Sequence, residues 1–297
     1  MEAVQFERDL PLLPKVCRLS APRRTDLGRA FLSALRESDS MSDLSPPPPS
    51  VRHAIRHWRP EDAWYKPIAC AAVVQLSRLI MRGLNKIQFE RREYWDEAFT
   101  QRSRGLLSFS NHVSLFDDPL LISNLGKTRY SEVRWIPADH INFFGSYLKG
   151  LLFSSGKCVP IIRGGGLDQP GFSFLLDRLQ NGEWVHIFPE GGRTREAGAR
   201  LRTPFKQGIG RLLVEAKPLS LPFYHLGMER ILPIGAAVPR LGKKVQVLFG
   251  KPTLVDSTWI DQLEGPERPS VKATNWAQME LESLESQARQ EFQPAPL

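Results

Sequence analysis

A histidine and an aspartate stand five positions apart in the segment Asn111–Pro119, which reads NHVSLFDDP. Across one helical turn such a pair can fold together, so that Asp117 accepts a hydrogen bond from one nitrogen of His112. The other imidazole nitrogen can then take a proton from a hydroxyl group. The segment therefore predicts a His–Asp dyad that acts as a general base, although the same residues could instead cap a helix and favour its first turn.

The dyad has no evident nucleophile of its own. Ser114 lies inside the segment, but the strained GxSxG turn that exposes a nucleophilic serine does not occur in the chain. We therefore expect the attacking hydroxyl to belong to the substrate. A metal reading is less favoured because its ligands, His112, Asp117, Asp118 and His140, match no familiar metal spacing. We expect neither a metal nor a cofactor.

Two further clusters offer groups that bind an anion. Gly156–Gly166, GKCVPIIRGGG, runs from a predicted strand into a glycine-rich loop, where Arg163 can bind a phosphate bidentately and backbone N–H groups can approach it. In Phe188–Arg193, FPEGGR, Glu190 could accept a hydrogen bond from a substrate hydroxyl while Arg193 holds a phosphate. A flexible turn and a solvated basic loop would have the same compositions.

Each cluster follows a short apolar run, which is the pattern of an α/β domain that carries its functional loops at the carboxyl ends of strands. We expect strands at Leu106–Phe109, Val133–Pro137, Cys158–Ile162, Trp184–Phe188, Leu219–Phe223 and Val245–Phe249. We expect helices at Pro119–Ser123, Gly171–Gln180 and Lys206–Lys217, and an acidic helix at Trp276–Phe292.

The first 60 residues differ in composition from the rest of the 297-residue chain. They hold ten basic residues, several serines and the run Pro46–Pro49, which predict a mobile extension over 1–60 ahead of one folded domain over 61–297. A mitochondrial transit peptide is an alternative, although seven acidic residues in this segment disfavour it. Three scattered cysteines exclude a disulfide scaffold and predict reduced thiols.

The net charge of +8 is concentrated in the centre of the chain, where residues 61–250 carry 26 Lys and Arg against 17 Asp and Glu. Such a field suits nucleic acid, an anionic membrane surface or a phosphorylated substrate. Because no recognition helix or aromatic-rich strand pair accompanies the basic residues, we expect no nucleic-acid partner.

Two apolar segments favour contact with a membrane surface. Pro67–Met81 is interrupted by a glutamine and an arginine, and predicts an amphipathic helix instead of a membrane-spanning one. Phe143–Phe153 is also rich in apolar residues, with Lys149 and Lys157 nearby to meet anionic headgroups. Together they favour a peripheral or monotopic membrane protein, whereas packing on the domain core is the alternative for each helix.

In this order, the clusters resemble the motifs of the glycerolipid acyltransferase superfamily. The HxxxxD, glycine–arginine and FPEG motifs correspond to His112–Asp117, Gly156–Arg163 and Phe188–Gly191. The apolar strand predicted at Leu219–Phe223 stands in the position of the fourth motif. The resemblance implies a glycerol-3-phosphate acyltransferase-like α/β domain, in which a central sheet is flanked by helices and amphipathic helices contact the membrane.

A narrower resemblance, over about residues 60–252, is to the mitochondrial transacylases of this superfamily. It rests on NHxSxxDDP at Asn111–Pro119, GKCVP at Gly156–Pro160 and WVHIFPEG at Trp184–Gly191. Further matches are GIGRL at Gly208–Leu212, LPFYHLGMERILP at Leu221–Pro233 and VLFGKP at Val247–Pro252. The resemblance implies an enzyme of mitochondrial membranes that moves an acyl chain from a phospholipid to a lysophospholipid and remodels cardiolipin without coenzyme A.

Carried over by position, the resemblance makes His112 the general base and Asp117 the residue that orients it. The resemblance also implies that Arg163, Glu190 and Gly191 bind the acceptor. His112 would deprotonate a lysophospholipid hydroxyl, which attacks an ester carbonyl, and the imidazolium would then protonate the leaving oxygen.

Two alternative functions stay open. The residues after the FPEG motif, Gly192–Thr194, are more like those of acyl-CoA-dependent lysophosphatidate acyltransferases, for which a coenzyme A thioester is the co-substrate. The other alternative, from a different class, is a catalytically silent scaffold that binds membranes through its basic centre and amphipathic segments.

Overall fold

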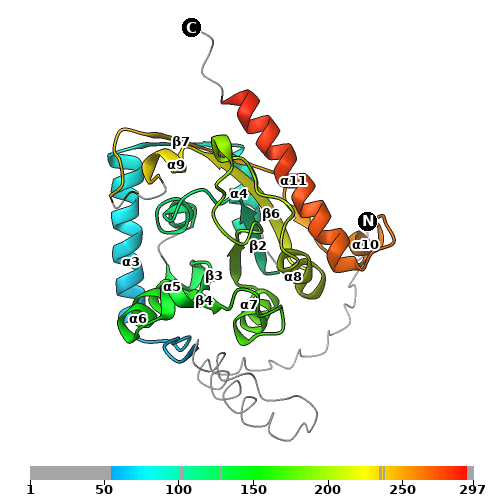
Figure 1. Cartoon of the computed structure of the whole chain (residues 1–297), viewed down its shortest axis with the longest axis horizontal. Helices are drawn as coiled ribbons and strands as arrows, with labels where there is room; N and C mark the ends of the chain where they lie inside the picture. Colours follow the sequence, from blue (N-terminus) through cyan, green and yellow to red (C-terminus); the bar gives the residue numbers. More distant parts are fainter. Residues whose placement is uncertain (1–54, 101–103, 127–128, 234–235, 237, 293–297) are drawn as a thin grey trace, which may run out of the picture. The chain divides into compact units, whose positions relative to one another are not determined.

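The computed structural model describes residues 55–292, apart from 101–103, 127–128, 234–235 and 237. The contacts divide the chain after Pro46, and the described residues all belong to the unit that begins at Pro47. Most of the predicted mobile extension, residues 1–54, therefore lies outside the described residues. The described unit has an α/β fold with helices on both faces of a sheet, which confirms the predicted fold class (Figure 1).

The central sheet has the strand order β1-β7-β6-β2-β5, with β8 beside β6. Its strands are β1 (Lys86–Glu90), β2 (Leu106–Ser110), β5 (Trp184–Ile187), β6 (Leu219–Leu226), β7 (Lys244–Phe249) and β8 (Thr253–Leu254). Strand β2 is parallel to both β5 and β6, whereas β7 is antiparallel to β6 and parallel to β1. The carboxyl ends of β2, β5 and β6 therefore meet at one edge, where α/β sheets place their functional loops.

A second pair of parallel strands, β3 (Ile136–Asp139) and β4 (Cys158–Ile161), continues this arrangement. Trp135, just before β3, forms a parallel bridge with Val185 of β5, and its N–H donates to the carbonyl of Trp184 at 2.8 Å. The pair thus extends the sheet beyond β5. The loop after β4, which carries Arg163, comes to the same edge as the loops after β2 and β5.

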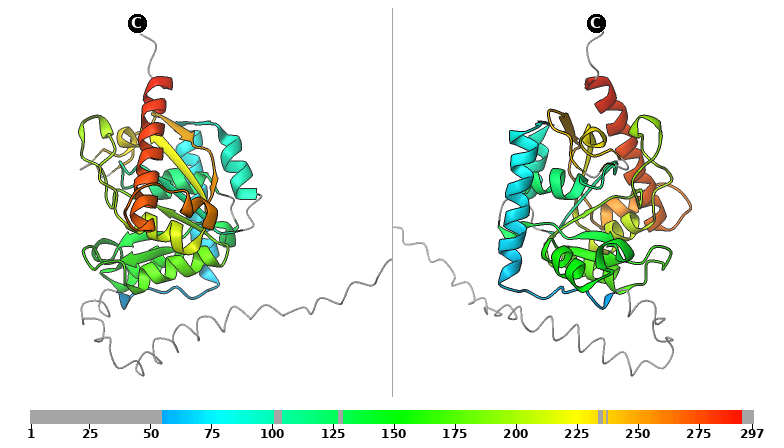
Figure 2. Two further views of the ribbon diagram at one scale, coloured as in Figure 1. Left: turned by 90° about the vertical axis from the view of Figure 1, so that its right-hand side faces the viewer. Right: turned by 60° about the vertical axis from the view of Figure 1, so that its left-hand side comes forward.

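Helices and short helical turns cover the sheet. The helices are α3 (Tyr65–Arg78), α4 (Arg92–Thr100), α5 (His140–Phe144), α6 (Tyr147–Ser155), α7 (Pro170–Gln180), α8 (Gly208–Ala216), α9 (Met228–Ile231), α10 (Ser257–Asp261) and α11 (Pro269–Glu291). The short turns near the site are η2 (Leu79–Gly83), η3 (Asp117–Leu121), η4 (Ile122–Asn124) and η5 (Tyr130–Glu132). In the views of Figures 1 and 2, α3 and α11 lie on opposite sides of the sheet.

Successive side chains of β2 point to opposite faces of the sheet, and on each face they pack into an apolar cluster with the helices that cover it. Leu107 and Phe109 point to the cluster formed with α7, α8 and α11, and Leu106 points to the cluster formed with α4, η2 and η3. In the second cluster, the rings of Trp95 and Trp184 meet edge to face with centroids 5.0 Å apart. Burial of each large apolar side chain contributes about 1.5–3 kcal/mol to stability, so both faces hold β2 and its loop in place.

The close approach of α8 and α11 depends on a glycine. A Cβ atom at Gly210 would lie 1.8 Å from the carbonyl oxygen of Ser270. No other residue could fit there without moving α11, which packs against β6 and β7.

The predicted strands are all present, with shifted ends. Strand β3 begins at Ile136 and not at Val133, because the η5 turn and the buried side chain of Arg134 occupy the preceding positions. Helix α11 begins at Pro269, earlier than the predicted start at Trp276, since a proline is well suited to the first turn of a helix. The segment Pro119–Ser123 forms π and 3₁₀ turns instead of an α-helix.

The sequence patterns predict no element at β1, α4 or β8. The strand β1, KIQFE, has an alternating and partly exposed pattern at the edge of the sheet, which differs from the continuous apolar runs of the central strands. Helix α4 is short and carries several charges, so that only Trp95, Ala98 and Phe99 mark its buried face.

The two predicted amphipathic segments fold as helices. Pro67–Met81 lies in α3 and continues into the π-helical turn η2, while Phe143–Phe153 is divided into α5 and α6 around Gly145. No helix of the described residues is long and apolar enough to span a membrane.

The predicted role of Lys157 at a membrane surface is wrong, because this side chain is buried. Its ammonium group donates to the carbonyl of Val133 at 3.2 Å, lies 3.5 Å from the Glu183 carboxylate and sits 4.9 Å from the centre of the Trp135 ring. Burial lowers its pKa, and the Glu183 charge opposes that change. Lys149 is exposed on α6, as expected.

Candidate active site

The predicted dyad is formed at the carboxyl end of β2. His112 Nδ1 lies 2.9 Å from Asp117 Oδ2. The same oxygen accepts hydrogen bonds from the backbone N–H groups of Val113, at 2.7 Å, and Ser114, at 2.9 Å. Asp117 is fully buried at the start of η3, so the loop wraps around its carboxylate and fixes the imidazole in one orientation.

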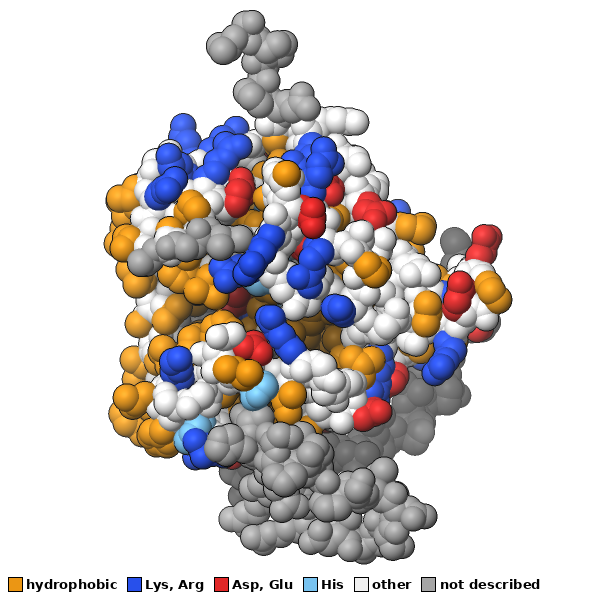
Figure 3. All heavy atoms as spheres, in the orientation of Figure 1, with side chains coloured by type: hydrophobic (Ala, Val, Ile, Leu, Met, Phe, Trp, Pro, Cys, Tyr) orange, Lys and Arg blue, Asp and Glu red, His pale blue; other side chains and the backbone are white. Residues whose placement is uncertain are grey.

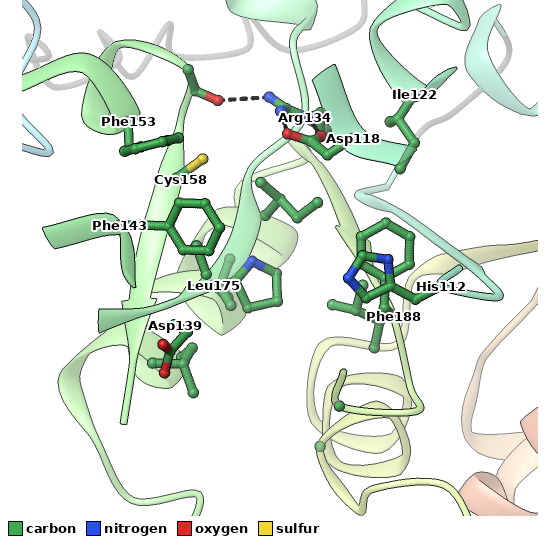
Figure 4. A pocket seen from close by; sticks show the side chains of 18 of the residues that line it. His112, Asp118, Ile122, Arg134, Asp139, Phe143, Phe153, Cys158, Leu175 and Phe188 are labelled. Carbon is green, nitrogen blue, oxygen red and sulfur yellow. Dashed lines mark hydrogen bonds and ion pairs between the residues drawn. The ribbon is translucent and has the colours of Figure 1, made fainter. Parts of the chain in front are cut away.

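The imidazole of His112 is also held from below. Its ring stacks on the Phe188 ring at the end of β5, with centroids 4.0 Å apart and planes inclined by 10° (Figure 4). The carbonyl of His112 accepts the N–H of Thr194 at 2.8 Å. In the neutral tautomer whose Nδ1–H donates to Asp117, Nε2 carries the free lone pair and lies on the opposite side of the ring, where a substrate hydroxyl could bind.

Ser114 is not placed to act as a nucleophile in this site. Ser114 is fully buried, and its hydroxyl donates to the carbonyl of Leu232 at 3.2 Å. Within the described residues, no group of three or more His, Cys, Asp or Glu side chains could hold a metal ion. The site therefore offers a base without a protein nucleophile.

A cavity of about 970 Å³ runs past His112 into the interior of the unit. Most of its wall is apolar and comes from α3, α6, α7, α8 and the strands between them. The apolar side chains that line it include Val73, Val74, Phe143, Leu152, Phe153, Phe172, Leu175 and Leu212. Figure 4 shows Phe143 and Phe153 across the cavity from His112. A cavity of this size and lining suits an acyl chain beside a general base.

The mouth of the cavity is cationic. Arg163, Arg202 and Lys206 line it together with Gly191 and Gly192. In Figure 3, basic side chains gather around a hollow in the middle of the face shown. The loops after β4 and β5 supply these residues, as the topology of the sheet requires.

Two guanidinium groups converge on Gly192. A Cβ atom placed there would lie 3.7 and 3.8 Å from the terminal nitrogens of Arg163, and 3.9 Å from Arg202 Nη1. Asp139 Oδ1 lies 3.6 Å from Nε of Arg163, and this ion pair orients the Arg163 side chain. The terminal nitrogens of both arginines can bind the oxygens of one phosphate group, and the missing side chain at Gly192 leaves space for it.

The other residues predicted to bind substrate, Gly191, Arg193 and Glu190, occupy three different kinds of position. Gly191 lines the mouth, whereas Arg193 does not line the cavity, and Arg202 and Lys206 supply the cations there. Glu190 is fully buried, and its two carboxylate oxygens accept the backbone N–H groups of His112 at 2.6 Å and Arg202 at 2.9 Å. Burial raises the pKa of Glu190 to about 7. The roles of Glu190 and Arg193 in acceptor binding stay predictions.

The cavity wall also contains an ion pair that the sequence analysis missed. Arg134 Nε donates to Asp118 Oδ1 at 2.6 Å, a second guanidinium nitrogen donates to the other carboxylate oxygen, and Nη1 donates to the carbonyl of Gly156 at 2.6 Å (Figure 4). Burial opposes the charge of Arg134, but the Asp118 carboxylate outweighs it and raises the pKa of the guanidinium. The pair joins η3, which carries Asp117, to the start of β4.

Residues 78–226 match the sequence profile of the family described as Acyltransferase. The chain belongs to the acyltransferase family. This confirms the family assignment from the HxxxxD and FPEG motifs, both of which lie inside the matched region.

This acyltransferase is similar over half or more of its length to three known proteins. The chain is 34% identical to tafazzin of Drosophila melanogaster over 203 residues, which cover 65% of this chain and 53% of that protein. It is 31% identical to the Dictyostelium discoideum protein named taffazin over 206 residues, 66% of this chain and 68% of that protein. It is 32% identical to N-acylphosphatidylethanolamine synthase of Arabidopsis thaliana over 162 residues, 51% of this chain and 56% of that protein. The match thus spans about half to two thirds of the length of each relative.

Proposed function

We propose that the chain is a tafazzin-like phospholipid–lysophospholipid transacylase, which moves a fatty acyl chain between phospholipids in cardiolipin remodelling at a mitochondrial membrane. The observation that carries this proposal is the His112–Asp117 dyad beside an apolar cavity with a cationic mouth. The similarity to two tafazzins and the motif resemblance support the substrate class and the location.

The geometry suits a direct proton relay between two lipids. Nε2 of His112 takes the proton of a lysophospholipid hydroxyl, and the hydroxyl oxygen forms a bond to the ester carbonyl carbon of the donor phospholipid. The bond from that carbon to the leaving oxygen then breaks, and the imidazolium returns its proton to this oxygen. Buried Asp117 stabilises the imidazolium between the two steps.

A lipid substrate must reach His112 without exposing its chains to water. Val73 and Leu152 line the cavity from α3 and α6, and these two helices also expose Ile68, Leu76 and Leu148 at the surface. Each CH₂ group that leaves the bilayer for water costs about 0.8 kcal/mol, so an enzyme at the interface gains by accepting the chain directly. We therefore place this apolar face of α3 and α6 against one leaflet as a peripheral or monotopic contact.

Only some apolar residues of the second predicted membrane segment, Phe143–Phe153, are exposed and available to contact the membrane. Phe144 is buried in the core, and Phe143 and Phe153 line the cavity. The exposed aliphatic residues of α5 and α6 include Ile141, Leu148 and Leu152, with 68%, 75% and 56% of their surfaces accessible. These residues, and not Phe144, would enter the leaflet.

The acyl donor and the acceptor are decided by one experiment. Purified protein is incubated with bilayers of labelled phosphatidylcholine, monolysocardiolipin and phosphatidylethanolamine, with and without acyl-CoA. Transfer of label to monolysocardiolipin without coenzyme A supports the proposal. Transfer only from acyl-CoA would establish the coenzyme A-dependent alternative, and label on the amine of phosphatidylethanolamine would point to the activity named for the Arabidopsis relative.

A matched pair of variants separates catalysis from membrane binding. His112→Gln should abolish transfer and keep vesicle binding, whereas His57→Gln, outside the cavity, should keep both. If the parent protein binds vesicles and transfers no acyl group from any donor, the silent-scaffold alternative replaces this proposal.

A further inference from the structure

Strands β1 and β7 begin with two lysines side by side. Lys86 and Lys244 are direct neighbours in the parallel ladder, and both side chains are exposed. The turn before β7 is fixed to the turn before β1, since Lys86 N–H donates to the carbonyl of Lys243 at 2.9 Å and Lys243 N–H donates to Asn85 Oδ1 at 2.8 Å. The positions of these cations are therefore set by the sheet.

With exposed Arg240 and half-buried Lys243, these lysines form a cluster that we name the basic edge: Lys86, Arg240, Lys243 and Lys244. Within the described part of the chain, none of its members forms an ion pair with a carboxylate. The acidic residue of the nearby α9, Glu229, lies 3.4 Å from Arg230 and accepts the N–H of Gly227 at 2.9 Å. Like charges on neighbouring strands repel, so the free protein keeps an unfavourable arrangement here.

Exposed apolar residues accompany the basic edge. Leu84, Val238 and Leu241 have 45%, 72% and 54% of their surfaces accessible. The N–H of Gly242 donates to the carbonyl of Leu84 at 2.9 Å, which joins the two turns that carry them. Leu84 directly follows η2, so these residues continue the exposed apolar side of α3 and η2, where Leu76 and Leu79 are each 58% accessible.

The same arrangement is visible on the surface. Figure 3 shows basic side chains gathered at the upper left, above the C-terminal end of α3, next to an orange margin of apolar side chains. Apolar residues flanked by cations are the composition of surfaces that lie in the headgroup region of a bilayer.

We propose that the basic edge binds the anionic headgroups of membrane lipids and so fixes how the chain sits on a leaflet. This proposal rests on the membrane contact in the proposed function, and adds a lipid class and a site distinct from the cavity. No carboxylate of the described residues offsets the repulsion between Lys86 and Lys244. Anionic headgroups would do so. Nearby Leu84 and Leu241 would enter the region below the headgroups, which favours a bilayer over nucleic acid.

The test variant is Lys86→Gln with Lys244→Gln, and the matched control is Lys251→Gln with Arg268→Gln, two exposed cations away from the edge. Both double variants change the net charge equally. Binding is measured by sedimentation with vesicles of phosphatidylcholine alone and with vesicles that also contain phosphatidylglycerol, at low and high salt. The thermal midpoint without vesicles and the turnover of a short-chain monomeric phospholipid are measured for each protein.

We expect the parent to prefer the anionic vesicles and to lose that preference at high salt. Each neutralised lysine should weaken binding to anionic vesicles by roughly five-fold, or roughly 30-fold for the pair, with little change for neutral vesicles. The thermal midpoint should stay the same or rise, because a repulsion is removed. Turnover of the short-chain substrate should be unchanged.

Two outcomes would overturn the proposal that the basic edge binds anionic headgroups. One is equal binding of the parent to neutral and anionic vesicles, and the other is an equal loss of binding in the control variant, which would indicate a general charge effect. These outcomes can coexist with acyl transfer by the parent, in which case the proposed function stands. Conversely, the parent could bind anionic vesicles through Lys86 and Lys244 but transfer no acyl group. This result would support headgroup binding by the basic edge and contradict only the proposed function.

Discussion

Glu190 accepts a 2.6 Å hydrogen bond from the backbone N–H of His112, a residue 78 positions away in the sequence. The other oxygen of the same carboxylate accepts the N–H of Arg202 at 2.9 Å, and the Arg202 guanidinium donates to the carbonyl of Glu190 at 2.7 Å. One buried side chain thus joins the loop that carries the base to the loop that carries a cation of the mouth. We therefore expect Glu190 to act on the site through its neighbours, as a positioning residue, with direct contact to the acceptor as the alternative.

Glu190→Gln should lower both stability and kcat. The amide places an NH₂ group against one of two backbone N–H donors, which removes a hydrogen bond and costs about 1–3 kcal/mol of the free energy of unfolding. Because Glu190 does not line the cavity, KM for the lysophospholipid should stay near its original value. The control is Glu282→Gln, at an exposed position of α11. A raised KM with an unchanged kcat would instead establish direct contact between Glu190 and the substrate.

The stability difference between the parent and Glu190→Gln should depend on pH. Burial raises the pKa of Glu190 from 4.5 to about 7, so the folded chain holds a proton between these values that the unfolded chain releases. The stabilisation is therefore complete below pH 4.5 and is lost as the pH rises to about 7, by at most about 3 kcal/mol. Denaturant unfolding of both proteins at several pH values measures this difference, because the titrations of the other groups are common to both proteins. A difference that is constant with pH would contradict a buried, neutral Glu190.

Asp117→Asn should separate the charge of this residue from its shape. The amide oxygen can keep the hydrogen bonds to Val113 and Ser114, and its NH₂ group can take the place of Oδ1, for which no hydrogen-bond partner is found among the described residues. Loss of the charge that stabilises the imidazolium should lower kcat by about 10²–10⁴-fold, the range of general base catalysis. Single-turnover transfer and circular dichroism are the measurements. Full activity in a folded Asp117→Asn protein would mean that the charge of Asp117 does not stabilise the imidazolium during the reaction.

The buried pair of Arg134 and Asp118 should show strong coupling. Arg134→Met alone, or Asp118→Leu alone, leaves one charge without its partner in the cavity wall and should cost about 3–5 kcal/mol. The double variant removes both charges, so its loss should be smaller than the sum of the single losses by up to about 3 kcal/mol. Denaturant unfolding of the four proteins completes the cycle. Additive losses would show that the two side chains stabilise the fold independently.

The sequence predicts the interior of the sheet and the dyad because both depend on local patterns. Strands such as β2 are buried on both faces and are rich in apolar residues, and the spacing of His112 and Asp117 brings them together within one turn. The edge strand β1 lacks such a run, since its exposed positions alternate with partly buried ones. Its place beside β7 depends on a contact distant in sequence, which no local pattern records.

The partners of the site residues could not be predicted for the same reason. Arg134 meets Asp118, and Arg163 meets Asp139, through the packing of separate strands and turns. In the basic loop after β5, no periodicity shows which cations point into the cavity: Arg202 and Lys206 line it, whereas Arg193, which is predicted to hold a phosphate, does not.

Gly192→Ala should weaken the binding of the lipid phosphate and leave the fold intact. The added methyl group would lie 3.7–3.9 Å from Arg163 and Arg202, ordinary contact distances, so the free energy of unfolding should change by no more than about 0.5 kcal/mol. It would nevertheless occupy the space between the two guanidinium groups, where we expect a phosphate oxygen, and KM for the phospholipid should rise while kcat stays the same. Gly191→Ala is the contrasting variant: its φ of 71° lies in the left-handed region, so the alanine should cost about 1–2 kcal/mol of stability. If Gly192→Ala has an unchanged KM, the phosphate binds away from this pair of arginines.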